Sequence, residues 1–248
     1  MSYDQPVDSN KVSQPEEEDL FDYAYEQPGS IPGTLNIEED AEIPKIALID
    51  YNSDRASHEI NLTPEACAEH LTTESVSWVD VKGLGSENIL QRLGTVFGLH
   101  PLVLEDIVNV PQRPKLEDYP QQLVIITQMV VLKPSGEGFS LEQVSLVVGK
   151  NYLLTVQEYP EKDCFRPVRR RIKFNKGSIR NMGADYLAYA LWDAIIDGFF
   201  PVLEIYGEKI ENLEDEVIFN PSNQSLAKVY QIKRELLALR RAIWPQRN

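Results

Sequence analysis

The sequence has little cysteine, no long apolar run and far fewer basic than acidic residues. Cys67 and Cys164 are the only cysteines in 248 residues, which excludes a disulfide framework and a cysteine-rich zinc site. The 24 Lys and Arg against 39 Asp and Glu give a formal net charge of -15, which argues against nucleic acid as a partner. The most apolar stretch, Leu123 to Leu132, is interrupted by Thr127 and Gln128, so we expect that the chain does not span a bilayer.

The sequence also lacks recognisable catalytic motifs. The three histidines, His58, His70 and His100, occur in unrelated contexts and at no spacing typical of a zinc site. Gly83 and Gly85 are not followed by the Gly-Lys-Ser/Thr of a phosphate-binding loop. No nucleophile is accompanied by an obvious general base. We therefore expect no catalytic residues, no bound organic cofactor and no enzymatic activity.

The acidity is concentrated in the first 44 residues, which hold 12 of the 39 acidic residues and one of the 24 basic ones. This segment is rich in Pro, Ser and Glu and has no apolar periodicity, so we expect a disordered tail through about Gly33. A solubilising tail is the simplest interpretation. The alternative is a docking peptide built on Phe21, Tyr23 and Tyr25. The segment has neither the basic start nor the apolar stretch of a signal peptide.

Residues 45–183 have the pattern of a layered α/β sandwich. Apolar alternation and continuous apolar runs predict strands over Lys45–Tyr51, His58–Leu62, Ser75–Val81, Leu123–Leu132, Glu142–Val148 and Tyr152–Gln157. Helical spacing and capping residues predict helices over Pro64–Leu71, between Ser86 and Gly98, and over Pro101–Val110. Because helices flank the strand cluster, we expect a sheet with mixed strand directions covered on both faces.

Residues 184–248 are predicted to be helical. A long helix is expected from Ala184 to about Phe219, and a second from Ser225 to Trp244, with Ser222 as a cap after Asn220 and Pro221. The first arm is acidic and the second mostly basic, which is typical of an antiparallel helical hairpin. The last residues leave apolar side chains without a cap, so we interpret the ending as a cut.

Two pairs of carboxylates stand in unusually apolar helices. Glu105 and Asp106 are adjacent in PLVLEDIV, and Asp193 and Asp197 lie one turn apart in LAYALWDAIIDGFF. Burying carboxylates in such surroundings costs free energy unless they reach water, a hydrogen-bond donor or a cation. The first pair fits a solvated helix face, and the second fits pairing with arginines of the RPVRRR segment. Alternatively, these hard oxygen ligands bind a divalent ion such as Mg²⁺, which needs only one or two carboxylates and keeps several waters.

Several blocks of the sequence resemble one known family. GLHPLVLEDIVN, QRPKLEDY, EQVSLVVGKNYLLTVQE, ADYLAYALWDAIID and LRRAIWPQR are similar, in this order, to the cytoplasmic domain of CorA-type magnesium transporters. The resemblance covers roughly Lys45 to the end. It implies an α/β/α sandwich with a mixed sheet, a long helical hairpin and the start of a stalk helix, assembled as a funnel-shaped homopentamer. The rest of the stalk, two membrane helices and the Gly-Met-Asn pore signature are missing from this sequence.

The resemblance also implies a function for the carboxylates. In the family, divalent cations bind between neighbouring cytoplasmic domains and hold the pore closed, and the ligand positions fall on Glu105 and Asp106, with Asp193 nearby. Asp197 also matches an acidic position. We therefore expect a domain that senses intracellular Mg²⁺, with Co²⁺ as a further ion. The full-length protein would lie in the inner membrane with this domain in the cytoplasm, and the fragment itself would be soluble.

Three alternatives remain open from the sequence. The first is a zinc or other divalent-ion exporter built on the same cytoplasmic fold. The second is a soluble metal-dependent enzyme such as a hydrolase. The third is an interaction module in which the acidic tail and the charged hairpin recruit a partner.

Overall fold

A seven-stranded mixed sheet lies at the centre of the computed structural model, which describes residues 29, 31–133, 138–159 and 164–247. The strands are β1 (Lys45–Tyr51), β2 (Ala56–Ile60), β3 (Val76–Lys82), β4 (Lys115–Tyr119), β5 (Gln122–Leu132), β6 (Phe139–Val148) and β7 (Tyr152–Gln157). Their order is β2-β1-β3-β7-β6-β5-β4. Only the β3–β7 neighbours are parallel and all other neighbours are antiparallel, which confirms the predicted mixed sheet.

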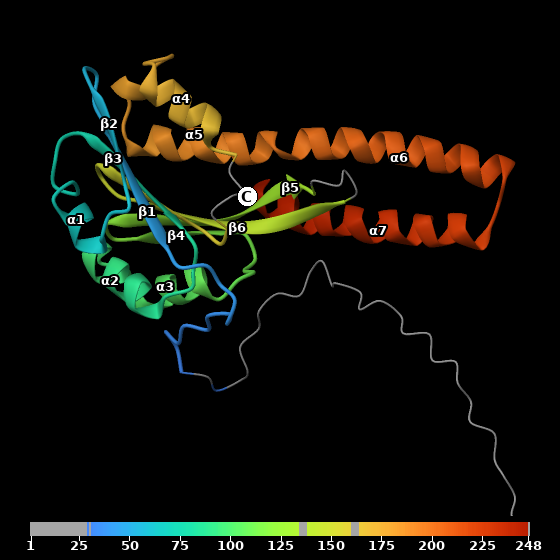
Figure 1. The fold of residues 1–248 in the computed structure, drawn as a ribbon, viewed down its shortest axis with the longest axis horizontal. Helices are drawn as coiled ribbons and strands as arrows, with labels where there is room; N and C mark the ends of the chain where they lie inside the picture. Colours follow the sequence, from blue (N-terminus) through green and yellow to red (C-terminus); the bar gives the residue numbers. More distant parts are fainter. Residues whose placement is uncertain (1–28, 30, 134–137, 160–163, 248) are drawn as a thin grey trace, which may run out of the picture.

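Helices cover both faces of this sheet (Figure 1). They are α1 (Pro64–Ala68), α2 (Glu87–Phe97), α3 (Pro101–Val108), α4 (Arg166–Lys173), α5 (Ala184–Asp197), α6 (Phe199–Phe219) and α7 (Asn223–Ile243). The first three lie on one side, whereas α4, α5 and the base of the α6–α7 hairpin lie on the other (Figure 1). The predicted α/β/α sandwich with a helical hairpin is therefore confirmed.

The central strands are buried on both faces, so successive side chains enter two different cores. In β3, Val76 and Trp78 face the core beneath α4 and α5, whereas Val79 and Val81 face the core beneath α2 and α3. Because strand side chains alternate with a period of two, a continuous apolar run is what such a strand requires. This explains why the predicted strands in the middle of the sheet agree closely with the observed ones.

The predicted helix caps are present. The Ser86 hydroxyl accepts a hydrogen bond from the Ile89 amide at 3.4 Å, and α2 ends at Gly98, whose φ of 61° is left-handed. The Thr63 hydroxyl accepts one from the Ala66 amide at the start of α1. Ser222 begins α7 by accepting a hydrogen bond from the Ser225 amide at 3.0 Å.

The edge strand β4 was not predicted. Its sequence, KLEDY, is short and mostly charged, and Leu116 at its centre is exposed. It pairs antiparallel with β5, placing Leu116 opposite Ile125. Charged residues are common on edge strands because they discourage pairing with other chains. Such a strand therefore lacks the apolar alternation from which strands are recognised.

The C-terminal helices differ in two places from the prediction. The long helix expected from Ala184 to Phe219 is divided at Gly198 into α5 and α6. The segment Trp244–Arg247, expected to begin the stalk helix, forms a 3-10 turn instead. Gln246 in this turn is buried, accepts a hydrogen bond from the Thr127 hydroxyl at 2.7 Å and donates one to the Gln128 carbonyl oxygen at 3.0 Å. These contacts attach the turn to β5.

The combined segment Ala184–Phe219 is long and apolar enough to cross a membrane, judged by length and composition alone. This differs from the expectation that the sequence contains no such stretch. Its most apolar 18-residue window is 39% buried against the rest of the protein. Leu187, Leu191 and Ile195 of this segment belong to the core between the sheet and helices α4 and α5. A core helix of a soluble protein passes the same test, so this one segment is weak evidence for a membrane span.

A buried ion pair fastens α4 to the sheet. Arg169 donates a hydrogen bond to Asp80 at 2.6 Å, and the Asp80 side chain is only 4% exposed. The second carboxylate oxygen accepts a hydrogen bond from the Thr155 hydroxyl, which in turn accepts one from the Trp78 indole. The Arg169 guanidinium lies 4.9 Å from the centroid of the Trp78 ring. This network joins β3, β7 and α4.

Replacing Arg169 with methionine is predicted to destabilise the fold by about 3–5 kcal/mol, because it leaves the Asp80 carboxylate buried without its counter-charge. Urea denaturation followed by circular dichroism measures this loss. The matched control is Arg170→Met at an exposed position of the same helix, expected to change stability by less than about 0.5 kcal/mol. Equal losses in the two variants would contradict the assigned role of the ion pair.

Candidate metal-binding site

The first predicted pair, Glu105 and Asp106, lies on the half-buried side of α3. The helix begins at His100, whose Nδ1 accepts a hydrogen bond from the Leu102 amide, and Pro101 occupies its first turn. Its apolar residues Val103, Ile107 and Val108 are buried in the core between the sheet and helices α2 and α3. This anchoring fixes the direction in which the two carboxylates leave the helix.

Glu105 holds the segment that precedes β1. One of its carboxylate oxygens accepts a hydrogen bond from the Gly33 amide. One helical turn later, the buried Asn109 accepts a hydrogen bond from the Asn36 amide at 2.8 Å and donates one to the Thr34 carbonyl oxygen at 3.3 Å. Residues 31–37 are thus held against α3, although disorder was expected through about Gly33. The earlier part of the predicted tail, with Phe21, Tyr23 and Tyr25, lies outside the described residues.

Asp106 is already paired with a cation of this chain. The Lys115 ammonium lies 2.7 Å from Asp106 and 3.1 Å from Glu117, and the Asp106 side chain is 18% exposed. Partial burial lowers the pKa of Lys115, but the hydrogen bonds from its ammonium to Asp106 and Glu117 outweigh burial, so the pKa lies above its ordinary value. Lys115 therefore stays charged at neutral pH. A divalent ion binding at Asp106 must displace this ammonium or share the carboxylate with it.

The second predicted pair, Asp193 and Asp197, is exposed on α5. The two residues are four apart in the helix, so their side chains lie on the same face. Within the described residues neither carboxylate has an ion-pair partner, so the expected pairing with the RPVRRR arginines is not observed there. Arg169 of that segment pairs with Asp80.

The two pairs of carboxylates lie on opposite layers of the sandwich. Helix α3 packs on one face of the sheet and α5 on the other (Figure 1). The part of the chain that the structure describes contains no group of three or more His, Cys, Asp or Glu side chains able to hold a metal ion. A metal site that uses both pairs therefore needs a second copy of the chain.

The sequence did not reveal Lys115 as a residue of this site. Nothing in its local sequence distinguishes it from other surface lysines, and it lies nine residues from Asp106. The contact depends on β4, the edge strand that was not predicted, because Lys115 begins this strand.

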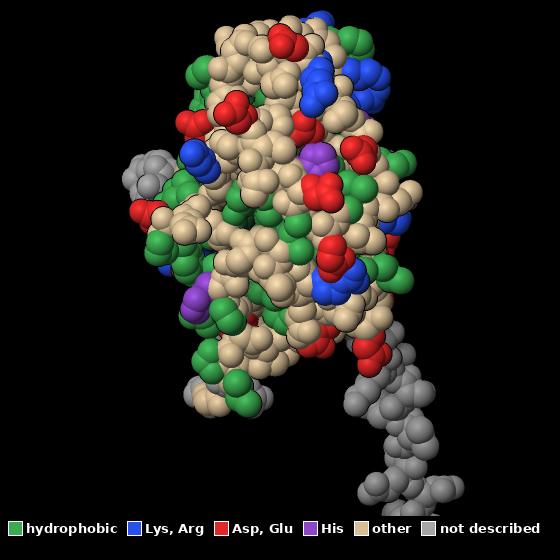
Figure 2. Space-filling model, turned by 90° about the vertical axis from the view of Figure 1, so that its left-hand side faces the viewer, with side chains coloured by type: hydrophobic (Ala, Val, Ile, Leu, Met, Phe, Trp, Pro, Cys, Tyr) green, Lys and Arg blue, Asp and Glu red, His purple; other side chains and the backbone are tan. Residues whose placement is uncertain are grey.

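Charges of both signs are interspersed on the end of the molecule opposite the hairpin. Figure 2 shows acidic, basic and histidine side chains scattered over this face among apolar and uncharged ones. Nucleic-acid-binding surfaces gather basic residues on one face or stripe. On this face, as far as the structure describes it, no such gathering is visible.

The fold defines a structural class, the α/β/α sandwich with an attached helical hairpin. The soluble domain of CorA from Methanocaldococcus jannaschii superposes with a TM-score of 0.61 at 16% identity, over 82% of this chain and 76% of that one. The full-length CmaX protein superposes with a TM-score of 0.63 at 16% identity, over 85% and 62%. At these identities the likeness establishes the fold alone.

Sequence comparison assigns the family. Residues 73–248 match the CorA-like Mg²⁺ transporter protein family. The chain is 37% identical over 221 residues to the cobalt/magnesium transport protein CorA of Thermotoga maritima, spanning 89% of this chain and 62% of that protein. It is also 24% identical over 181 residues to the putative metal ion transporter YfjQ of Bacillus subtilis, spanning 73% and 55%. The chain belongs to the CorA-like Mg²⁺ transporter family and spans a little over half the length of these relatives.

Two substitutions separate the structural contact of Glu105 from its charge. Glu105→Ala removes the acceptor for the Gly33 amide, so hydrogen exchange at the amides of Gly33 and Asn36 is predicted to accelerate at least about tenfold. Glu105→Gln keeps an acceptor oxygen and is predicted to leave this exchange within about twofold of the original rate. Exchange followed by NMR tests this. Equal acceleration in both variants would show that the carboxylate charge, rather than the hydrogen bond, holds the segment.

Proposed function

We propose that this chain is the cytoplasmic regulatory domain of a magnesium transporter that also accepts Co²⁺, and that it binds divalent cations between subunits to close the pore. The observation that carries the proposal is the 37% identity, over 89% of this chain, to a protein named a cobalt/magnesium transport protein. The proposal includes a homopentamer, attached to the inner membrane by segments outside this chain, with this domain in the cytoplasm. It includes no catalytic role.

The proposed ligands are Glu105 and Asp106 of one subunit and Asp193 and Asp197 of its neighbour. Their oxygen atoms are the hard donors that Mg²⁺ prefers, and an ion that keeps several waters needs only one or two of them. Two observations support a site shared between subunits. The two pairs of carboxylates lie on opposite layers of one chain, and the described residues of one chain contain no cluster of three or more His, Cys, Asp or Glu side chains able to hold a metal ion.

Electrostatic repulsion supplies the regulatory step. Two carboxylates brought to about 4 Å across an interface repel by roughly 4 kcal/mol at an effective dielectric constant of about 20. A bound divalent cation reverses this repulsion and favours the assembly in which the subunits are close. Loss of the cation favours a separated arrangement, so occupancy biases a two-state equilibrium.

Lys115 competes with the metal in this mechanism. Its ammonium neutralises part of the charge of Asp106 when no divalent ion is bound, because the two groups are 2.7 Å apart. Metal binding then exchanges a monovalent for a divalent partner at Asp106, which lowers the apparent affinity for the metal. Such weakening suits a sensor for an ion that is abundant in cells.

The experiment is a titration of the chain with MgCl₂, followed by calorimetry and by sedimentation. We expect Mg²⁺ binding to accompany self-association, and Asp106→Asn and Asp193→Asn each to weaken it by about tenfold, the equivalent of one ligand worth about 1.4 kcal/mol. Asp118→Asn, at an exposed acidic position on β4, is the control and is expected to bind as the original chain does. Binding that is unchanged in all three variants would overturn the assignment of these ligands. A preference for Zn²⁺ over Mg²⁺ would favour the exporter alternative.

A second variant tests the competition by Lys115. Lys115→Gln removes the ammonium beside Asp106, so Mg²⁺ affinity is predicted to rise by about fivefold, the equivalent of about 1 kcal/mol from a partly exposed ion pair. Lys150→Gln, at an exposed lysine of the β6–β7 turn, is the matched control. Calorimetric titration of both variants measures the difference. An unchanged or lowered affinity in Lys115→Gln would contradict the proposed competition.

A further inference from the structure

Helix α4 and the turn that follows it concentrate basic side chains on an otherwise acidic protein. Residues 166–180 contain seven Arg and Lys and no Asp or Glu, in a chain whose formal net charge is -15. The helix has the sequence RPVRRRIK and lies outermost on its side of the sandwich, beyond α5 (Figure 1). Much of the basic charge of the chain is therefore gathered on one surface element.

Three of these seven side chains are used within the fold. Arg169 forms the buried ion pair with Asp80. Arg171 donates a hydrogen bond to a tyrosine hydroxyl of α5 at 3.2 Å, and Arg180 donates to two carbonyl oxygens near the end of α4. These three residues have structural partners, so they do not need an external anion.

The solvent side of α4 carries a basic stripe, which we define as Arg166, Arg170 and Lys173. All three are exposed, and they lie four and then three positions apart, so they share one side of the helix. Among the described residues, the structure pairs none of them with a carboxylate. Like charges at this spacing repel one another, and an anionic partner relieves the repulsion. The exposed Phe174 follows the stripe, with the Lys173 ammonium 5.7 Å from its ring centroid.

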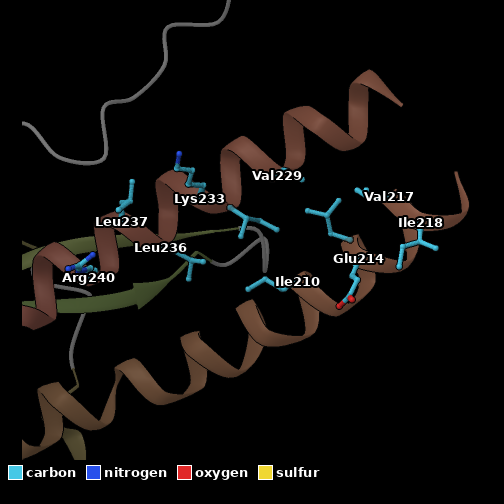
Figure 3. Close-up of a pocket in the computed structure, with 11 residues that line it drawn as sticks. Ile210, Glu214, Val217, Ile218, Val229, Lys233, Leu236, Leu237 and Arg240 are labelled. Carbon is cyan, nitrogen blue, oxygen red and sulfur yellow. The ribbon is translucent and has the colours of Figure 1, made fainter. Parts of the chain in front are cut away.

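The basic residues of the hairpin lie among acidic ones instead. Figure 3 shows Lys233 and Arg240 of α7 beside the apolar groove between α6 and α7, and Glu214 of α6 lines the same groove. Helix α6 contains six acidic residues and one basic, so the five basic residues of α7 lie along a helix of opposite charge. Lys228, for example, pairs with Glu216 at 2.7 Å. An acidic partner is therefore better matched to α4 than to the hairpin.

The chain itself contains a segment of matching chemistry. Residues 16–26, EEEDLFDYAYE, hold six acidic residues, no basic residue and three aromatic ones. We propose that this acidic segment docks on the basic stripe of α4 in the same chain. Its carboxylates neutralise the stripe, and its aromatic rings suit the arginine guanidiniums and the exposed Phe174, because cation–π and aromatic contacts favour such pairs.

The length of the intervening chain permits this contact. Gly33 is held by Glu105 against α3, which lies on the opposite layer from α4 (Figure 1). The 15 residues from Glu18 to Gly33 span at most about 50 Å when extended. Two helical layers and a sheet are together roughly 30 Å thick, so Glu18 reaches α4 around the edge of its own sheet. The tether keeps the segment near α4 at an effective concentration of about a millimolar, at which a weak contact is populated.

An anionic membrane surface also binds basic helices. Docking α4 on a membrane brings the rest of a chain with a net charge of -15 close to headgroups of the same sign, which is unfavourable. Docking the acidic segment instead joins opposite charges within the chain. The observations therefore favour the acidic segment, and membrane binding is an outcome that the experiment detects.

Zero-length cross-linking with a carbodiimide tests the proposal on the whole chain, because the reagent joins carboxylates to lysines that they contact. Without added divalent cations the result is independent of the proposed function. We expect mass spectrometry to find cross-links from residues 16–26 to Lys173 or Lys176, in a product of monomer mass. Their yield is expected to fall at least about fivefold at about 1 M NaCl, where the Debye length is about 3 Å.

Charge reversal of the stripe gives the second arm. Arg166→Glu/Arg170→Glu leaves the reporting lysines in place and is expected to lower the cross-link yield at least fivefold. The matched control, Arg55→Glu/Lys150→Glu, makes the same change of net charge at exposed positions outside α4 and is expected to keep the yield within about twofold. Circular dichroism of both variants confirms folding.

Four results would overturn the proposal. They are the absence of these cross-links, cross-links only between separate copies, an undiminished yield in Arg166→Glu/Arg170→Glu, and an equal loss in the control. Flotation with vesicles of phosphatidylcholine and phosphatidylserine separates the membrane alternative. Absent cross-links, together with vesicle binding that Arg166→Glu/Arg170→Glu abolishes, would assign the stripe to a membrane surface in place of the acidic segment.

Discussion

Burial of the sheet on both faces is the constraint on which the rest of the structure depends. In β3, Trp78 enters one core and Val79 enters the other, so the helices on the two sides pack on separate sets of side chains. The buried pair Arg169–Asp80 then fastens one helical layer to the same strand. A helix cannot move from one face of the sheet to the other without exposing the apolar side chains that it buries. The two layers are therefore fixed on opposite sides.

This separation decides how the acidic residues can act. Glu105 and Asp106 belong to one layer, Asp193 and Asp197 to the other, and a single chain cannot bring them to one ion. Within one chain the first pair is engaged by contacts of its own, with the Gly33 amide on Glu105 and the Lys115 ammonium on Asp106. In the function that we propose, cation binding is linked to assembly, because one copy supplies the ligands that another lacks.

The sequence predicted those features that depend on local patterns. Continuous apolar runs identified the central strands because both of their faces are buried, and Ser86 and Gly98 marked the ends of α2 because capping is a local interaction. The strand β4 was missed because it is short and charged, and with it the contact of Lys115 to Asp106. The attachment of Gln246 to β5 was also missed. It joins residues more than a hundred positions apart, and nothing in the local sequence reports such a contact.

The most direct test of the central claim is to locate a bound ion. Crystals of the chain grown with Co²⁺ allow the metal to be found by its anomalous scattering. The account predicts a peak between the carboxylates of Glu105 or Asp106 of one copy and those of Asp193 or Asp197 of a neighbouring copy. A peak whose protein ligands all come from one copy, or the absence of any peak at these carboxylates, would contradict it.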